Sequence, residues 1–381
     1  MKCRYNIIGT RVRSCIRLLL LLQLMLSFVQ TEAQENMAKI TIGGNVYGGG
    51  NAGNTGGSTS VTVRSGDINA VFGGARMANV GGSTCVNIDG EHASSDILIN
   101  SVYGGNDISG TIGQSETLPK ALENVKPDVS STDKTKNAID NSWNTFVVTS
   151  PCGTKETVTI DGVQMTADSK MLVIGSLFGG GNGEYFYRNE GDTHEIYLTE
   201  DDYKAGKAPI ASNATGFTRP ELGKTYLELR GGNIAHVYGG GNNATVTDNV
   251  TINIDNTSDN LEKGVRVWAH RNNLSLQEVL QYLHSRVGLA IFQSNLTSYA
   301  YNFSRIFGGN NKADMAIRPT WNLQKGVIRD LFSGGNKGAM TYEKGILLPI
   351  SPVNSNDLKI ENVFGGCRMA DVNPAKAPIP E

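Results

Sequence analysis

The sequence is poor in cysteine, and its cysteines form no recognisable metal or disulfide pattern. Five cysteines occur in 381 residues, and only Cys85, Cys152 and Cys367 follow residue 33. An odd number of cysteines without a Cys-x-x-Cys pair matches neither a zinc-binding spacing nor a disulfide framework. We therefore predict no metal site and favour three buried, reduced side chains, with one disulfide bond as the alternative.

Long apolar runs are absent after the N-terminus. The first residues are basic, an apolar run follows at 18–29, and Thr31-Glu32-Ala33 comes next. This order is typical of a secretory signal peptide cleaved after Ala33. The apolar run is shorter than the ~20 residues of a membrane-spanning helix. We therefore predict a signal peptide at 1–33, with an uncleaved anchor as the alternative, and a mature chain without a transmembrane span.

Positive charge is also scarce. The sequence holds 34 basic and 36 acidic residues, and the first 33 residues contain five of the basic and one of the acidic ones. The mature chain is thus left with 29 basic and 35 acidic residues, a formal net charge of −6. Because no basic stripe is present, we do not expect nucleic acid as a partner.

No catalytic motif is recognisable. The five histidines are scattered, and His194-Glu195 lacks the second histidine of a metal-binding helix. Asp89, Asp161 and Asp255 each end a strand-like run, and an acidic row of this kind would suit a polysaccharide lyase or hydrolase. Asp-Gly and Asp-Asn are, however, ordinary turn dipeptides. We therefore predict no enzyme activity.

One short stretch, 104–107, reads Gly-Gly-Asn-Asp and is faintly similar to calcium-binding nonapeptide repeats. Those repeats return every nine residues or so and are rich in Asp. Only one copy of the phrase described next carries Asp, so we predict neither calcium nor any other cofactor.

Glycine, in contrast, is abundant and regularly placed. The 46 glycines are about 12% of the chain, and no Gly-X-Y period is present, which excludes collagen. One repeat phrase, an aliphatic residue, an aromatic residue and usually Gly-Gly, occurs eight times. Its first glycine is replaced only by Ser333, and its second never is. The copies start at Val46, Val71, Val102, Leu177, Val237, Ile306, Leu331 and Val363, and in five of them Asn follows five residues after the aliphatic one, at Asn51, Asn182, Asn242, Asn311 and Asn336.

The residues before each phrase alternate between apolar and polar, as at 60–63, 225–229 and 250–254. Such alternation between glycines predicts short strands. One unit cannot bury its apolar face alone, but stacked units can. The sequence therefore predicts an all-β repeat solenoid, a right-handed parallel β-helix with inserted loops and one short helix. The alternative, a β-sandwich or propeller, would need more even units.

Stacking also explains the residue types of the phrase. The paired glycines suit a corner that needs positive φ or close backbone approach. Asn tolerates the left-handed region, and we expect each Asn to hydrogen-bond to the Asn of the next coil.

Three stretches depart from the pattern. Residues 106–145 are polar and predict a mobile loop outside the solenoid, and residues 183–223 are charged and irregular. In the third stretch, Ser275 and Glu278 have the spacing of a helix capping box. The predicted divisions are a signal peptide (1–33), solenoid repeats (34–113), a polar insert with irregular strands (114–170), solenoid repeats (171–255) with an inserted loop (183–223), a helical insert (256–305), and solenoid repeats that stop in mid-repeat (306–381).

The phrases VYGGGN, VFGGARMANVGG, STCVNIDG and VYGGNDISGTIG resemble a group of exported, glycine-rich, adhesin-like surface proteins of Gram-negative anaerobic bacteria. The resemblance covers 40–113 well and 224–255 and 306–372 less closely. The resemblance implies a β-helical fold and a location at the cell surface. The group has no agreed catalytic residues, so the resemblance assigns none to this chain. The last repeat departs from the pattern of the group. Residues 363–372 repeat the pattern of 71–80, but the earlier copy continues into the strand-like GGSTCVNIDG, whereas the chain stops nine residues after the later one.

The aromatic residues of the phrase are the candidate ligand-binding site. If the aliphatic residues face inward, the rings face outward and form a stripe on which sugars stack. The alternative, which we favour, is that the glycine corner turns the rings into the core. The candidate residues are Tyr47, Phe72, Tyr103, Phe178, Tyr238, Phe307, Phe332 and Phe364.

The function predicted from the sequence is that of a secreted or cell-surface, adhesin-like scaffold without catalytic activity, with glycans or cell-surface proteins as partners. A carbohydrate-active β-helix enzyme is one alternative, which a close cluster of three or more carboxylates would favour. A truncated remnant of a longer surface protein is another. An incompletely capped solenoid end at 363–381 further predicts self-association.

Overall fold

The computed structural model describes residues 40–115, 118–123, 143–288, 300–341 and 357–372. The predicted signal peptide and cleavage site, 1–33, lie outside the described residues.

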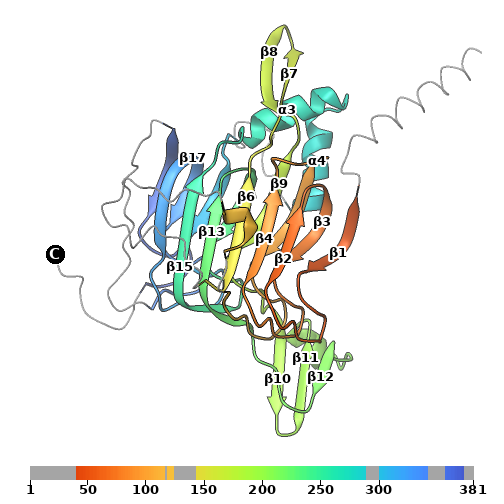
Figure 1. Ribbon diagram of the computed structural model, residues 1–381, viewed down its shortest axis with the longest axis vertical. Coiled ribbons are helices and arrows are strands. Elements are labelled where there is room, and N and C mark those ends of the chain that lie inside the picture. Colours follow the sequence, from red (N-terminus) through yellow and green to blue (C-terminus); the bar gives the residue numbers. More distant parts are fainter. Residues whose placement is uncertain (1–39, 116–117, 124–142, 289–299, 342–356, 373–381) are drawn as a thin grey trace, which may run out of the picture.

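Two parallel β-sheets form the body of the molecule (Figure 1). In each coil the chain runs along one sheet, turns a corner, returns along the other and crosses a short third side. Sheet I contains β1 (Thr41–Tyr47), β3 (Gly66–Phe72), β5 (Ile97–Tyr103), β9 (Leu172–Phe178), β14 (Asn233–Tyr238), β16 (Phe303–Phe307), the second half of β17 (Thr320–Phe332) and β18 (Leu358–Phe364). Sheet II contains β2 (Thr59–Val63), β4 (Thr84–Asp89), β6 (Thr145–Ser150), β13 (Glu221–Leu229), β15 (Thr245–Asp255) and the first half of β17.

The predicted parallel β-helix is confirmed. Every copy of the repeat phrase ends a strand of sheet I, and neighbouring copies pair in register, as Tyr47 does with Phe72 and Phe332 with Phe364. β17 runs from sheet II into sheet I through Gly326, whose φ is +134°. Gly66 and Gly232 lie at the same corner in other coils and also have positive φ. Glycine is favoured at this corner because side chains disfavour that conformation.

The main core lies between the two sheets. The aliphatic residues of the phrase point into it, and Val71, Val102 and Leu177 are fully buried there. They pack against sheet II residues such as Val86 and Leu227. Burying a side chain of this size contributes about 1.5–3 kcal/mol, and repetition in every coil makes this core the main source of stability.

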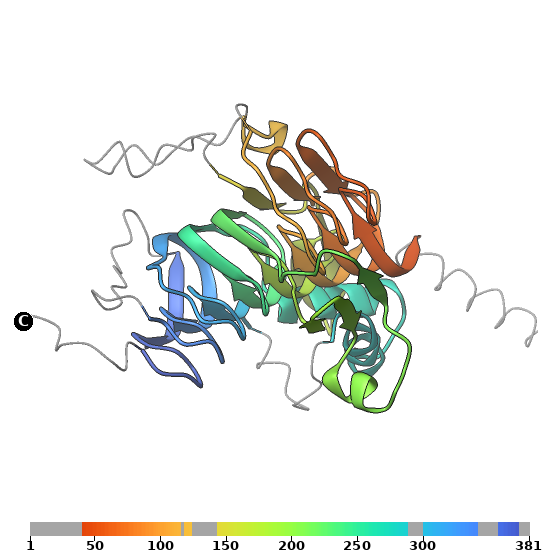
Figure 2. The same ribbon diagram turned by 90° about the horizontal axis from the view of Figure 1, so that it is seen from below.

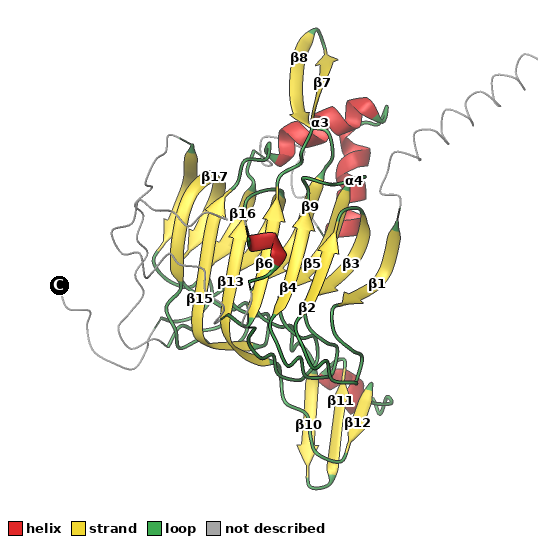
Figure 3. Ribbon diagram, viewed as in Figure 1, coloured by secondary structure: helices red, strands yellow, loops and turns green. Residues whose placement is uncertain are grey.

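The inserts leave the coils at opposite ends of the strands (Figure 3). At one end lie the antiparallel hairpin of β7 (Lys155–Ile160) and β8 (Val163–Asp168) and two helices, α3 (Leu261–Arg271) and α4 (Leu276–Val287). Figure 2 places these helices beside sheet I, on the side away from sheet II. At the other end lies a small antiparallel sheet with a short helix, made of β10 (Phe186–Glu190), β11 (Thr193–Tyr197), α2 (Glu200–Lys204) and β12 (Ala211–Asn213).

Several details differ from the sequence predictions. The capping box of Ser275 and Glu278 is confirmed at α4, but the expectation of one helix is wrong, because α2 and α3 are present as well. Within 183–223, residues 186–213 form a small antiparallel sheet with a short helix rather than a loop, and Glu221 begins β13 of sheet II.

The polar stretch 106–145 does not leave the solenoid as a whole. Its beginning stays in the coil, where Ser109 and Ile112 bridge to Met77 and Val80. Its end enters β6, which pairs with β4 and β13 in sheet II. Between them lies a short 3-10 helix, Lys120–Leu122, and 124–142 lie outside the described residues.

Among the described residues, no helix has the length and hydropathy required to span a bilayer.

Candidate functional site

The eight aromatic rings of the repeat phrase form one continuous stack, which we call the aromatic ladder. Neighbouring ring centroids lie 4.5–5.0 Å apart, and neighbouring planes are within 14° of parallel. Each stacked pair contributes about 0.5–1.5 kcal/mol beyond the burial of its surface. The ladder runs across every strand of sheet I.

The ladder lies on the outer face of sheet I. Its rings form a cluster with Ala70, separate from the core between the sheets, while their aliphatic neighbours belong to that core. Six of the rings are buried, as the favoured sequence interpretation requires, but they form a cluster of their own and do not join the core between the sheets.

Most of the ladder is nevertheless closed to a ligand. Six rings are at most 7% exposed, and each of them has ring neighbours on both flat faces. Tyr47 at one end is half-buried, whereas Phe364 at the other end is 42% exposed. A sugar that stacks on an aromatic ring needs a free flat face. Of the eight predicted residues, Phe364 offers the most accessible one.

A second column follows the aromatic ladder and consists of amide side chains, the amide ladder. Each asparagine donates from its Nδ2 to the Oδ1 of the preceding coil. The distances are 2.9 Å from Asn242 to Asn182, 2.8 Å from Asn311 to Asn242 and 2.7 Å from Asn336 to Asn311. The predicted hydrogen bonding between asparagines of successive coils is confirmed for four of the five, whereas Asn51 accepts a hydrogen bond from Arg76 instead. Each such bond contributes about 1 kcal/mol.

Charged residues terminate the amide ladder at both ends. Arg368 Nη1 donates to Asn336 Oδ1 over 3.3 Å, and Asn182 Nδ2 donates to Asp107 Oδ1 over 2.8 Å. Asp107 is 1% exposed and also accepts hydrogen bonds from the hydroxyls of Tyr185, at 2.9 Å, and Tyr47, at 2.7 Å. Three uncharged donors thus bind both oxygens of this carboxylate. Burial, together with Asp107, raises the pKa of Tyr47 to about 12.

The glycines of the phrase are required by close approach between coils, not by positive φ. A Cβ on Gly104 would lie 2.3 Å from the carbonyl oxygen of Gly179, which is too close for any real contact. The inward carbonyls are satisfied by threonines of sheet II: Thr84 Oγ1 donates to Gly104 over 2.6 Å, and Thr145 Oγ1 to Gly179 over 2.7 Å.

The three aspartates weighed for catalysis are not brought together. Asp161 lies in the turn between β7 and β8, whereas Asp89 and Asp255 end the sheet II strands β4 and β15. Against the effect of burial, hydrogen bonds from Arg64 and His92 lower the pKa of Asp89. In the described part of the chain, no group of three or more His, Cys, Asp or Glu side chains is placed to hold a metal ion.

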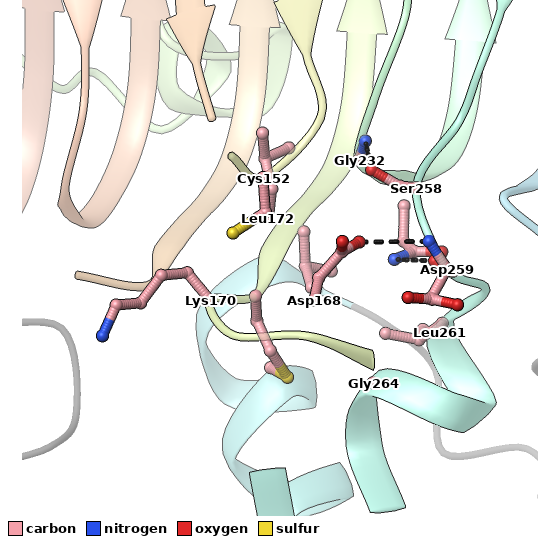
Figure 4. Close-up of a pocket in the computed structure, with 12 residues that line it drawn as sticks. Cys152, Asp168, Lys170, Leu172, Gly232, Ser258, Asp259, Leu261 and Gly264 are labelled. Carbon is pink, nitrogen blue, oxygen red and sulfur yellow. Dashed lines mark hydrogen bonds between the residues drawn. The ribbon is translucent and has the colours of Figure 1, made fainter. Parts of the chain in front are cut away.

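A small pocket lies where β8 and β9 meet the start of α3 (Figure 4). Asp168 and Asp259 line it, and Lys155 Nζ contacts both, at 2.6 Å and 2.8 Å. Burial raises the pKa of Asp168. Lys170 points away from these carboxylates. The cavity volume of about 10 Å³ is close to that of a single water site, so this ion network ties the hairpin to α3 rather than forming a substrate site.

The three cysteines that the structure describes are not paired with one another. Cys85 and Cys152 are buried, as expected, whereas Cys367 is only half-buried. Burial raises the pKa of the Cys85 thiol to about 12, and the group is therefore protonated at neutral pH.

The fold and its ladders define the chain as an all-β parallel β-helix protein. No family model matches it, and neither the curated proteins nor the solved structures contain a significant match.

Proposed function

We propose that the chain is a secreted or cell-surface scaffold without catalytic activity, of the adhesin-like kind that its repeat phrases resemble. One observation carries the proposal: the repeated side chains are used for contacts between coils. The aromatic ladder and the amide ladder cross the same coils side by side. Repetition of this kind produces a stiff, elongated support, because each coil is held by its two neighbours.

The partners in this proposal are glycans or cell-surface proteins, and the location is the surface of a Gram-negative bacterium. The inserts at both ends of the strands and the exposed coil edges provide the variable surface that a scaffold displays. The separation of Asp89, Asp161 and Asp255 favours the scaffold over a carbohydrate-active enzyme, which remains the alternative.

Two measurements on the purified protein test this proposal together. A glycan array and binding to whole cells report adhesion, and incubation with a panel of polysaccharides reports release of reducing or unsaturated ends. We expect binding without any change in the polysaccharide. Product formation that depends on one of the three aspartates would establish the enzyme instead.

A further inference from the structure

A column of outer-face residues runs beside the aromatic ladder, two residues before each ring. After Asn45 in the first coil, it holds small side chains, Ala70, Ser101 and Ser176. In the later coils it becomes charged or polar, with His236, Arg305, Asp330 and Asn362 paired in register. The outer face of sheet I thus changes character towards the C-terminal coils.

Three guanidinium groups gather in these coils. Arg305 Nε lies 3.6 Å from Asp330 Oδ2, and Arg329 Nε lies 3.1 Å from the same oxygen. Arg368 reaches across the coils to Asn336. Arg305 and Arg329 thus share the carboxylate of Asp330, which also accepts a 3.0 Å hydrogen bond from Asn362.

The cations are held close together in a partly desolvated place. Burial and the neighbouring Arg368 and Arg329 lower the pKa of Arg305. His236 receives a contact from Arg305 Nη1 at 3.4 Å, and burial and the three arginines lower the pKa of His236 to about 4. A neutral imidazole can accept this hydrogen bond, so His236 positions Arg305 without adding charge. Such a cluster of like charges is stabilised when an anion binds to it.

An aromatic platform lies in the same coils. Phe364 follows Asn362 by two residues, stacks on Phe332 at 4.5 Å and keeps 42% of its surface exposed. Met369, next to Arg368, is 62% exposed. A guanidinium cluster beside an open aromatic ring suits an acidic sugar, whose anionic group pairs with arginine while its ring packs on the aromatic face.

We propose that Arg305, Arg329 and Arg368 bind the carboxylate or sulfate group of an acidic glycan, with a sugar ring on Phe364. This assignment rests on the proposed function, because it names the ligand class that the scaffold displays. The pairing is charge-assisted and, for a carboxylate, bidentate, which arginine provides better than lysine. Asp330 holds two of the arginines in place, and the anion completes their coordination.

The test measures binding of the full chain to a sulfated oligosaccharide, an oligogalacturonate and a neutral oligosaccharide of equal length by calorimetry. Arg305→Gln and Arg368→Gln should each weaken binding of an acidic oligosaccharide by about tenfold to hundredfold. Gln at 305 keeps an N–H donor for His236 but removes the charge. Arg266→Gln on α3, where Arg266 pairs with Glu262, is the matched control and should bind as the wild type does.

The two acidic ligands distinguish sulfate from carboxylate recognition. Duplex DNA serves as a further polyanion, and equal affinity for DNA would overturn the glycan assignment. The arginine site would be overturned if the neutral oligosaccharide bound as tightly as the acidic ones. It would also be overturned if both arginine variants kept wild-type melting curves and neither changed the affinity for the acidic oligosaccharides. Either result would leave the proposed scaffold function intact.

A second readout is independent of the variants. A bound anion beside Arg305 offsets the positive charge around His236, so the pKa of His236, followed by NMR, should rise on saturation with the acidic ligand. Binding elsewhere on the molecule would leave this titration unchanged and would contradict the proposal.

Discussion

At the scale of single residues, the amide ladder shows how strongly one position is constrained by its neighbours. Asn242 accepts a hydrogen bond from Asn311 and donates to Asn182 Oδ1 at 2.9 Å and Glu184 Oε2 at 2.6 Å. An asparagine can do this because its side chain is both donor and acceptor. A carboxylate of the same shape can only accept.

Asn242→Asp should therefore destabilise the protein by about 3 kcal/mol, because a buried charge would face two acceptors. The measurement is the free energy of unfolding in denaturant. Asn51→Asp is the matched control: Asn51 is exposed and already accepts a hydrogen bond from Arg76 at 3.0 Å. Its stability should stay within about 0.5 kcal/mol of the wild type. Equal losses for both variants would contradict a continuous ladder.

His236 predicts a pH effect. Its folded-state pKa of about 4 lies below the ordinary value of 6.5, because burial and then Arg305, Arg329 and Arg368 disfavour its charged form. Between these two values the unfolded chain binds more protons. The contribution to stability is fully present above pH 6.5 and is lost as the pH falls towards 4, by up to ~3 kcal/mol.

The stability difference between wild type and His236→Gln isolates this contribution from that of other groups. Gln can still accept the hydrogen bond from Arg305 but does not titrate. The unfolding free energy of the wild type minus that of the His236→Gln variant should be constant above pH 6.5 and fall by up to ~3 kcal/mol as the pH is lowered towards 4. A difference that does not change between pH 7 and pH 4 would refute the assignment.

At the scale of elements, the corner formed by the paired glycines controls how closely coils stack. Gly104→Ala would place a Cβ 2.3 Å from the Gly179 carbonyl oxygen, and the coils would have to separate. We expect a loss of about 1–3 kcal/mol, the usual range for overpacking, measured by thermal unfolding. Gly53→Ala is the control, since nothing lies within 4 Å of its Cβ position. A neutral result at Gly104 would show that the coils can move apart freely.

The same elements show what the sequence could and could not predict. The strands of sheet I were predictable because the same phrase recurs eight times, and neighbouring copies among the first three and the last three are separated by about the length of one coil. The side on which the rings lie was not, because Ile99 and Val102 both face the core although they are three residues apart. The register between neighbouring strands skips Asn100, between Ile99 and Ser101. This irregularity shifts the alternation and turns Tyr103 outward, a backbone detail that residue types do not reveal.

The inserts were predictable only in part. α4 was found by its capping box. α3 was missed, although Leu261, Val265 and Trp268 have helical spacing and are buried, because Gly264 interrupts its sequence. Trp268 Nε1 donates to Asp96 at 2.7 Å, a contact across 172 residues that no local pattern contains. The arginine cluster was missed for the same reason, since Arg305, Arg329 and Arg368 are brought together only by stacking of the coils.

At the scale of the whole molecule, the described coils expose strand edges at both ends of the stack. β18 presents Val363, 43% exposed, and Phe364, 42% exposed. At the β1 end, Ile40 is 52% exposed. Unpaired strand edges with exposed apolar side chains tend to pair with another chain. Because β1 and β18 carry the same phrase, pairing between them is head-to-tail and can continue without closing.

We therefore predict concentration-dependent self-association, measured by light scattering. Val363→Lys should suppress it, because a charge on the edge strand opposes pairing, and deletion of 363–381 should change it by moving the exposed edge. Val163→Lys is the matched control: Val163 is 64% exposed but lies in the β7–β8 hairpin, away from both edges. An acidic glycan that occupies Phe364 should compete with association. A protein that stays monomeric at high concentration, with or without residues 363–381, would show that the edge at β18 is not available to a second copy.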